Sequence, residues 1–231
     1  MWDIKTILKD FIKTKDIQEF INHRFKSGSS IIISKKPFKY VATDYALFGI
    51  DVNCGTVEQV DNDYSLDDLR STDIVLDIGA CIGAFSLKVC KKVYRVFAVE
   101  PLMTEELKRN IELNQTKNIT VLSHALGVGE QDLEWMGMTK RINCMSLEEI
   151  VKLCGGHVDF LKVDCEGGEW SILPEELVGI RRIEMEIHSF KGMPKTAEFE
   201  RILQKAGFDY KKETLSKELM LIHAQASIEK V

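Results

Sequence analysis

Acids and one imidazole occur at two places in the sequence where they could take a proton from a substrate. Asp164 and Glu166 follow an apolar run at 158–163, and Glu186 and His188 close a second apolar run. If both runs are parallel strands, their carboxyl ends meet at one edge of a sheet, where ligands bind in open α/β folds. These four residues are our candidate catalytic group for a reaction with a hydroxyl nucleophile. His188 is the first choice of base and Asp164 the second.

A glycine loop and a downstream acid predict that an adenosine-containing cofactor binds nearby. The segment DIVLDIGACIGAFS reads as a buried strand followed by a tight turn with Gly79 and Gly83, where glycines let the backbone approach a ligand closely. Glu100 ends the next strand roughly 20 residues later, where an acid accepts hydrogen bonds from both ribose hydroxyls. The loop is G-x-x-x-G, with Cys81 in the place of the second glycine of a dinucleotide site. It is therefore similar to the first motif of class I S-adenosylmethionine methyltransferases.

The elements around these residues alternate between strands and helices from Asp73 onward, the pattern of a doubly wound sheet. We expect strands at 74–78, 94–99, 119–123, 158–163, 180–187, 208–213 and 218–225. The helices are expected at 83–91, 102–115, 147–153 and 196–206, with a β excursion at 131–145. Ser146 and Glu149 form a capping box for the third helix. The predicted fold class is α/β, a Rossmann-like and mostly parallel sheet with a terminal antiparallel hairpin.

Residues 1–70 read as an N-terminal helical and β-hairpin extension before a cofactor-binding domain at 71–231. Residues 2–25 repeat apolar side chains at helical spacing, residues 31–60 are short β-rich runs, and residues 65–70 suit a short helix with Ser65 as N-cap. We expect the extension to cover the substrate side rather than to anchor a membrane, and to govern the choice of substrate.

Several segments together resemble one family. LDIGACIGAFS, FAVEP, SHALG, MSLEEI, DFLKVDCEGGEWSIL and EMEIH are similar to the FkbM-type methyltransferases over about residues 73–190, most specifically through VDCEGGEW. The resemblance implies an S-adenosylmethionine-dependent O-methyltransferase that acts on hydroxyls of sugars, polyketides or other small molecules. Carried over by position, it implies cofactor contacts from Asp77, Gly79, Ala80, Cys81, Gly83, Glu100, Pro101, Ala125 and Asp164.

A divalent metal ion bound by the strand-end group is the alternative to a side chain that acts as a base. A cation held by Asp164, Glu166, Glu186 and His188 would lower the pKa of the acceptor hydroxyl directly. We expect metal-independent transfer, because Asp164 is also the natural partner of the amino acid part of the cofactor. Glu166 precedes two glycines and can turn toward the next helix, which it and Glu169 would cap in a purely structural role.

The composition favours a soluble enzyme without a large nucleic-acid surface. The chain has 231 residues and a net charge of −5, which is unfavourable for binding phosphates. Six cysteines without zinc spacing suit reduced thiols in the cytoplasm. No segment is long and apolar enough to span a bilayer, so we expect no membrane partner. The sequence leaves the oligomeric state open, a homodimer included.

Two other functions stay open at this stage. An RNA methyltransferase shares this cofactor domain, although Asp164 is not followed by the Pro-Pro-aromatic motif of base amino methylation and Cys165 has no preceding proline. A non-catalytic module that binds an adenosine cofactor would keep Glu100 and need no base. The glycine spacing disfavours a nicotinamide dehydrogenase. The expected partner is a small-molecule or carbohydrate hydroxyl acceptor, which the sequence does not identify further.

Overall fold

The computed structural model describes residues 31–35, 38–43, 45–49, 60, 63–135, 137–190 and 192–227. The helical pattern predicted at 2–25 lies outside these residues, as do residues 36–37, 44 and 50–59 of the predicted β-rich runs at 31–60, and Val60 at the end of these runs is helical. Among the described helices, none has both the length and the apolar character that a membrane crossing requires.

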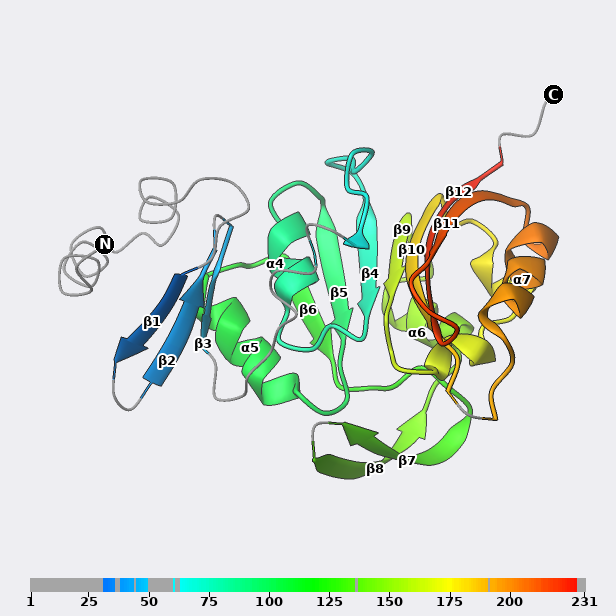
Figure 1. Cartoon of the computed structure of the whole chain (residues 1–231). Coiled ribbons are helices and arrows are strands. Elements are labelled where there is room, and N and C mark those ends of the chain that lie inside the picture. The colour runs from blue at the N-terminus through cyan, green and yellow to red at the C-terminus, as the bar shows by residue number, and fades with distance from the viewer. Residues whose placement is uncertain are drawn as a thin grey trace.

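A seven-stranded sheet is the centre of the fold (Figure 1), with strand order β11-β12-β10-β9-β4-β5-β6. Its strands are β4 (Ile74–Ile78), β5 (Arg95–Val99), β6 (Ile119–Leu122), β9 (Phe160–Val163), β10 (Arg182–His188), β11 (Phe208–Thr214) and β12 (Leu219–Ala226). Neighbouring strands from β6 to β10 are parallel, and β12 runs antiparallel to both β10 and β11. This confirms the predicted Rossmann-like sheet with its terminal antiparallel hairpin.

The connecting elements follow the predicted alternation. The α-helices are α4 (Ala84–Val89), α5 (Thr104–Leu113), α6 (Leu147–Leu153) and α7 (Glu200–Lys205). The 3₁₀ turns are η1 (Gly168–Ser171), η2 (Pro174–Leu177) and η3 (Thr196–Glu198). The predicted β excursion is a hairpin of β7 (Gly129–Trp135) and β8 (Met138–Cys144). Both hydrogen bonds of the capping box between Ser146 and Glu149 are present.

One predicted helix is not formed. Residues 67–68 make a turn in place of the helix expected at 65–70. The Ser65 N–H donates to the Glu184 carboxylate at 2.9 Å, and the Arg70 N–H donates to Asp73 Oδ2 at 2.8 Å. The carboxylates of Glu184 and Asp73 thus accept hydrogen bonds from backbone N–H groups at both ends of the segment. These contacts outweigh the local preference of residues 65–70 for a helix.

The three-stranded antiparallel sheet of the extension lies beside α5, at one end of the molecule in Figure 1. It consists of β1 (Ile31–Lys35), β2 (Phe38–Ala42) and β3 (Leu47–Gly49), in agreement with the predicted hairpins. Asn110 on α5 and Asn114 at its C-cap hold β3, because the Gly49 N–H donates to Asn110 Oδ1 and the Leu47 N–H donates to Asn114 Oδ1, both at 2.9 Å.

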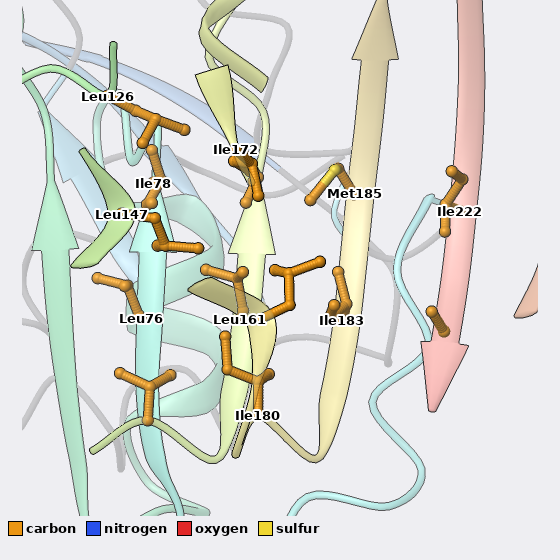
Figure 2. Packing of buried hydrophobic residues seen from close by; sticks show 14 of the residues in the cluster. Leu76, Ile78, Leu126, Leu147, Leu161, Ile172, Ile180, Ile183, Met185 and Ile222 are labelled. Atoms are coloured by element: carbon orange, nitrogen blue, oxygen red, sulfur yellow. The ribbon is translucent and has the colours of Figure 1, made fainter. Parts of the chain in front are cut away.

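The two faces of the main sheet differ in chemistry. Figure 2 shows the apolar face, where side chains from alternate positions of β4, β9, β10 and β12 pack together with residues of the connecting segments. The opposite face carries Asp77, Lys162, Glu184 and His223 in register across the same four strands. Acidic and basic side chains alternate along this row, and the first three are buried. Each of the two interior members is therefore flanked by groups that can carry the opposite charge.

We predict that Lys162→Met destabilises the protein by about 3–5 kcal/mol, because it leaves the buried Asp77 carboxylate without a compensating cation. Urea denaturation at neutral pH measures the change. The double variant Asp77→Asn/Lys162→Met should recover part of the loss, since it removes both charges. Lys152→Met is the matched control, because Lys152 forms an exposed ion pair with Glu148 on α6, and exposed ion pairs contribute little to stability. Equal losses for the two single variants would contradict the prediction.

Candidate active site

The predicted glycine loop packs directly on the predicted strand-end acid. Gly79, Cys81 and Gly83 have φ values of +75°, +50° and +92°, a region that favours glycine. A Cβ added at Gly79 would lie 1.7 Å from the carbonyl oxygen of Asp164. Only glycine fits there, and the close approach brings the turn after β4 against the residue that follows β9.

The amide groups of this loop are mostly used within the protein. The N–H groups of Gly79 and Ala80 both donate to the carbonyl of Val99 at 3.0 Å, and the Gly83 N–H donates to the Ala80 carbonyl at 2.8 Å. The Cys81 N–H donates to the Glu100 carboxylate at 2.8 Å. A loop that binds a phosphate needs such N–H groups free to point at the anion. This loop therefore suits a ligand that places no phosphate against it.

Glu100 is buried, with 6% of its surface exposed. Its Oε1 accepts hydrogen bonds from the N–H groups of Leu102 and Met103 at 2.7 and 2.9 Å, and its Oε2 accepts from Cys81. Burial raises the pKa of Glu100, and these three hydrogen bonds oppose the rise. A carboxylate has about four acceptor positions, so one remains on Oε2. The residue fits an adenosine ligand with room for one ribose hydroxyl rather than the two expected from the sequence.

Pro101 and Ala125 lie past the carboxyl ends of the neighbouring strands β5 and β6. Pro101 is partly exposed and Ala125 is buried. Thr104 links the two segments, because its hydroxyl donates to the Glu100 carbonyl at 2.6 Å and lies 3.1 Å from the Ser123 hydroxyl. Both predicted cofactor residues thus lie on the same edge of the sheet as the glycine loop.

Asp77 lies beneath the loop rather than at its surface. The side chain is fully buried, and the Ser86 hydroxyl donates to Oδ2 at 2.6 Å. Lys162 Nζ lies 3.3 Å from Oδ1. The structure therefore gives Asp77 contacts to α4 and to β9, where the sequence pattern suggested a direct cofactor contact.

Lys162 is a site residue that the sequence analysis missed. It is 3% exposed, and its ammonium group donates to the Gly79 carbonyl at 3.0 Å and lies 3.8 Å from Asp164 Oδ2. Burial alone would lower the pKa of Lys162, but attraction to Asp77, Asp164 and Glu186 raises it above its usual value. The available signal was a lone lysine within the apolar strand FLKV, because a buried lysine requires a partner.

Asp164, Glu186 and His188 come together as predicted. One potential ligand atom from each lies within 4.8 Å of the others. Tyr64, which the sequence analysis did not single out, donates its hydroxyl to Glu186 Oε1 at 2.6 Å and to Asp164 Oδ2 at 3.4 Å. Burial, followed by the charge of Asp164, raises the pKa of Glu186 to about 7. Tyr64 comes from the segment assigned to the extension, so that segment contributes directly to the cluster.

His188 is held between carboxylates. Its Nδ1 lies 3.3 Å from Glu169 Oε1, and its Nε2 lies 3.7 Å from Glu166 Oε2 and 4.0 Å from Asp164 Oδ1. Burial would lower the pKa of His188, but the Glu169 hydrogen bond and the surrounding negative charges raise it to about 9. A pKa in this range favours the imidazolium form of the ring at neutral pH. A ring that already carries both protons cannot act as the general base.

Glu169 and Glu166 have different positions. Glu169 is fully buried and accepts the N–H groups of Cys165 and Gly167 at 2.9 and 2.7 Å, which agrees with the structural alternative considered for it. The Glu166 side chain is 49% exposed, and its φ is +57°. Such a backbone is uncommon for a residue other than glycine and clusters at functional sites. Glu166 therefore faces the cluster from the solvent side.

Solved structures share this fold. Among those with similar structures is the Methanococcus jannaschii fibrillarin pre-rRNA processing protein, with 13% identity, coverage of 89% of this chain and 86% of that one, and a TM-score of 0.53. A chain of the fibrillarin/NOP5P complex has 16% identity, coverage of 85% and 97%, and a TM-score of 0.52. SMU.776, complexed with SAH, has 9% identity and a TM-score of 0.52, with coverage of 84% of this chain and 57% of that one. At these identities the likeness shows the fold alone.

The sequence itself matches a family. No curated protein matches the chain. The family model described as the methyltransferase FkbM domain matches residues 77–210, a span that contains the glycine loop, Glu100 and the strand-end cluster. The chain therefore belongs to the FkbM family of S-adenosylmethionine-dependent methyltransferases.

Proposed function

We propose that this protein methylates a hydroxyl group of a small molecule or carbohydrate. The observation that carries the proposal is the contact between Gly79 and Asp164, which leaves no room for a Cβ. It joins the loop expected to hold the cofactor to the group of acids expected to receive the acceptor. Reacting groups held at such a junction need little further assistance, because alignment supplies much of the catalysis.

The residues around the loop fit S-adenosylmethionine better than a dinucleotide. Glu100 offers one free acceptor position for a ribose hydroxyl. The loop amides are used internally, as a cofactor without a pyrophosphate allows. When bound, S-adenosylmethionine would supply an activated methyl group for transfer to the hydroxyl oxygen.

The hydroxyl proton would leave through the strand-end group of Asp164, Glu166, Glu186 and His188. The surrounding carboxylates raise the pKa of His188 to about 9 in the protein alone, which disfavours it as the base that we expected from the sequence. Its positive charge instead offsets part of the negative charge of the acids. The crowded carboxylates also oppose an RNA acceptor, because they repel the phosphates through which proteins bind nucleic acids.

We predict binding of S-adenosylmethionine and S-adenosylhomocysteine, but not of NAD, by isothermal titration calorimetry. Glu100→Ala should weaken the binding of S-adenosylmethionine by about 2 kcal/mol, since a hydrogen bond to a charged acceptor is lost. Glu112→Ala, an exposed position on α5, is the control. Unchanged affinity in a folded Glu100→Ala variant would exclude the ribose role, and binding of NAD alone would overturn the choice of cofactor.

We predict that His188 in chelator-treated protein titrates with a pKa of about 9. Proton NMR of the imidazole measures it, with the signal assigned through His188→Gln. Glu169→Gln should move this pKa toward its usual value of about 6.5, because Glu169 makes the largest contribution to raising it.

Stability should follow the same titration. The folded-state pKa lies above the unfolded one, so this contribution is fully present below about pH 6.5 and is lost as the pH rises toward 9. The free energy of unfolding of the metal-free protein should therefore fall between these pH values more than that of His188→Gln. A His188 signal that titrates near 6.5 in the parent protein would contradict the charged state assigned here.

A further inference from the structure

We propose that Asp164, Glu186 and His188 bind a divalent cation of the Mn²⁺ type, beside the loop that holds the cofactor. This inference rests on the proposed function only for the role of the cation, not for its binding. It replaces the metal-independent transfer expected from the sequence. The donor set is two carboxylates and one imidazole, a mixture that suits divalent cations intermediate between hard Mg²⁺ and softer Zn²⁺.

The three side chains are close enough to share one ion. One donor atom from each lies within 4.8 Å of the others. Metal–ligand bonds of roughly 2.0–2.6 Å place any two ligands of a cation within about 5 Å of each other. Asp164 and Glu186 are half-buried and His188 is buried, so the site has a wall of protein on one side and solvent access on the other.

The sheet fixes the positions of these ligands. Glu186 and His188 are two residues apart on β10, and side chains two residues apart lie on the same face of a strand. In the parallel pairing of β9 with β10, Val163 lies opposite Met185, so the next residue, Asp164, comes beside Glu186. A site built on the ends of two paired strands is already organised before a ligand binds.

A second observation is the way in which His188 and Glu186 are oriented. Nδ1 of His188 lies 3.3 Å from Glu169, whose carboxylate is itself held by the N–H groups of Cys165 and Gly167. This directs Nε2 toward Asp164. Metal-ligating histidines almost always have their other ring nitrogen held in this way, and ligating carboxylates are hydrogen-bonded in turn. The Tyr64 hydroxyl makes such a bond to Glu186.

The negative charges gathered at the site also favour the binding of a cation. Asp164, Glu166, Glu169 and Glu186 gather around one imidazole. The nearby ammonium group of Lys162 lies closer to Asp77 and the Gly79 carbonyl than to Asp164. A divalent cation would take the place of the Nε2 proton of His188, since a ligating imidazole is neutral, and would balance the carboxylates that Lys162 leaves uncompensated.

The cation would assist the loss of the acceptor's proton. A hydroxyl oxygen beside a divalent ion ionises more readily. The O–H bond breaks with its electron pair on oxygen, and the proton passes to a carboxylate oxygen of Glu166. Glu166 is half-exposed and lies outside the three ligands, so it can release the proton to water. No oxidant or further reactant is required.

Binding can be tested without any methyl acceptor. Chelator-treated full-length protein is titrated with Mn²⁺, and the free ion is measured by electron paramagnetic resonance. We expect one Mn²⁺ per chain, and at least tenfold weaker binding in each of Asp164→Asn, Glu186→Gln and His188→Gln. The variant Glu169→Gln should also weaken binding by about 10–100-fold, because it loosens the orientation of the imidazole. Glu134→Gln on β7 is a control that should bind as the parent does.

The possible failures are distinguishable. An absence of binding at millimolar Mn²⁺, or binding that the three ligand variants leave unchanged while circular dichroism shows them folded, overturns the site. Affinity for S-adenosylmethionine is measured separately, so this result would leave the proposed function intact. If the protein binds Mn²⁺ and methylates an acceptor, removal of the ion by chelation should abolish turnover and added Mn²⁺ should restore it. Turnover that survives chelation overturns the role in proton removal.

Discussion

The buried ammonium group of Lys162 is the interaction on which the rest of this site depends. It lies within the sheet between a fully buried carboxylate, Asp77, and the backbone carbonyl of Gly79. Burying either charge alone would cost several kcal/mol, and the pair is tolerable because each compensates the other. The same ammonium group lies 3.8 Å from Asp164. One side chain thus connects the base of the candidate cofactor loop to the first acid of the strand-end cluster.

These contacts explain why only glycine fits at position 79 of the loop. Lys162 and the carbonyl of Val99 hold the backbone at Gly79 from two sides, and the carbonyl of Asp164 fills the space where a side chain would be. The amides that face the ligand in a phosphate-binding loop are taken up in these contacts. The local geometry therefore selects against a dinucleotide as strongly as the glycine spacing does.

The chemistry of the site follows from a division between the faces of the sheet. One face of β4, β9, β10 and β12 is apolar and packs with α6 and α7 (Figure 2). The other face carries the charged row, which continues at the carboxyl edge into Asp164, Glu186 and His188. Because β4, β9 and β10 are parallel and in register, acids that are far apart in the sequence become neighbours. Burial, followed by the charge of Asp164, raises the pKa of Glu186, and Glu169, Glu166 and Asp164 raise the pKa of His188.

The sequence by itself determined the strands, most of the helices and the family. Apolar runs bounded by glycine, proline and capping residues report directly on local structure, and the predicted strands β4, β5 and β10 fall within two residues of those observed. The strand-end acids could also be assigned, because parallel strands bring their carboxyl ends to one edge.

The tertiary structure decided which groups touch and in what protonation state. Tyr64 contacts Asp164 across 100 residues of sequence, and no periodicity predicts such a contact because it depends on how the chain enters the sheet. The charge of His188 is set by Glu169 and two other acids brought to it by folding. The same neighbours disfavour His188 as the base that the sequence suggested. They also orient its ring in a way that suits the binding of a cation. Local patterns specify the elements, whereas the electrostatics of the site arise only when these elements are packed together.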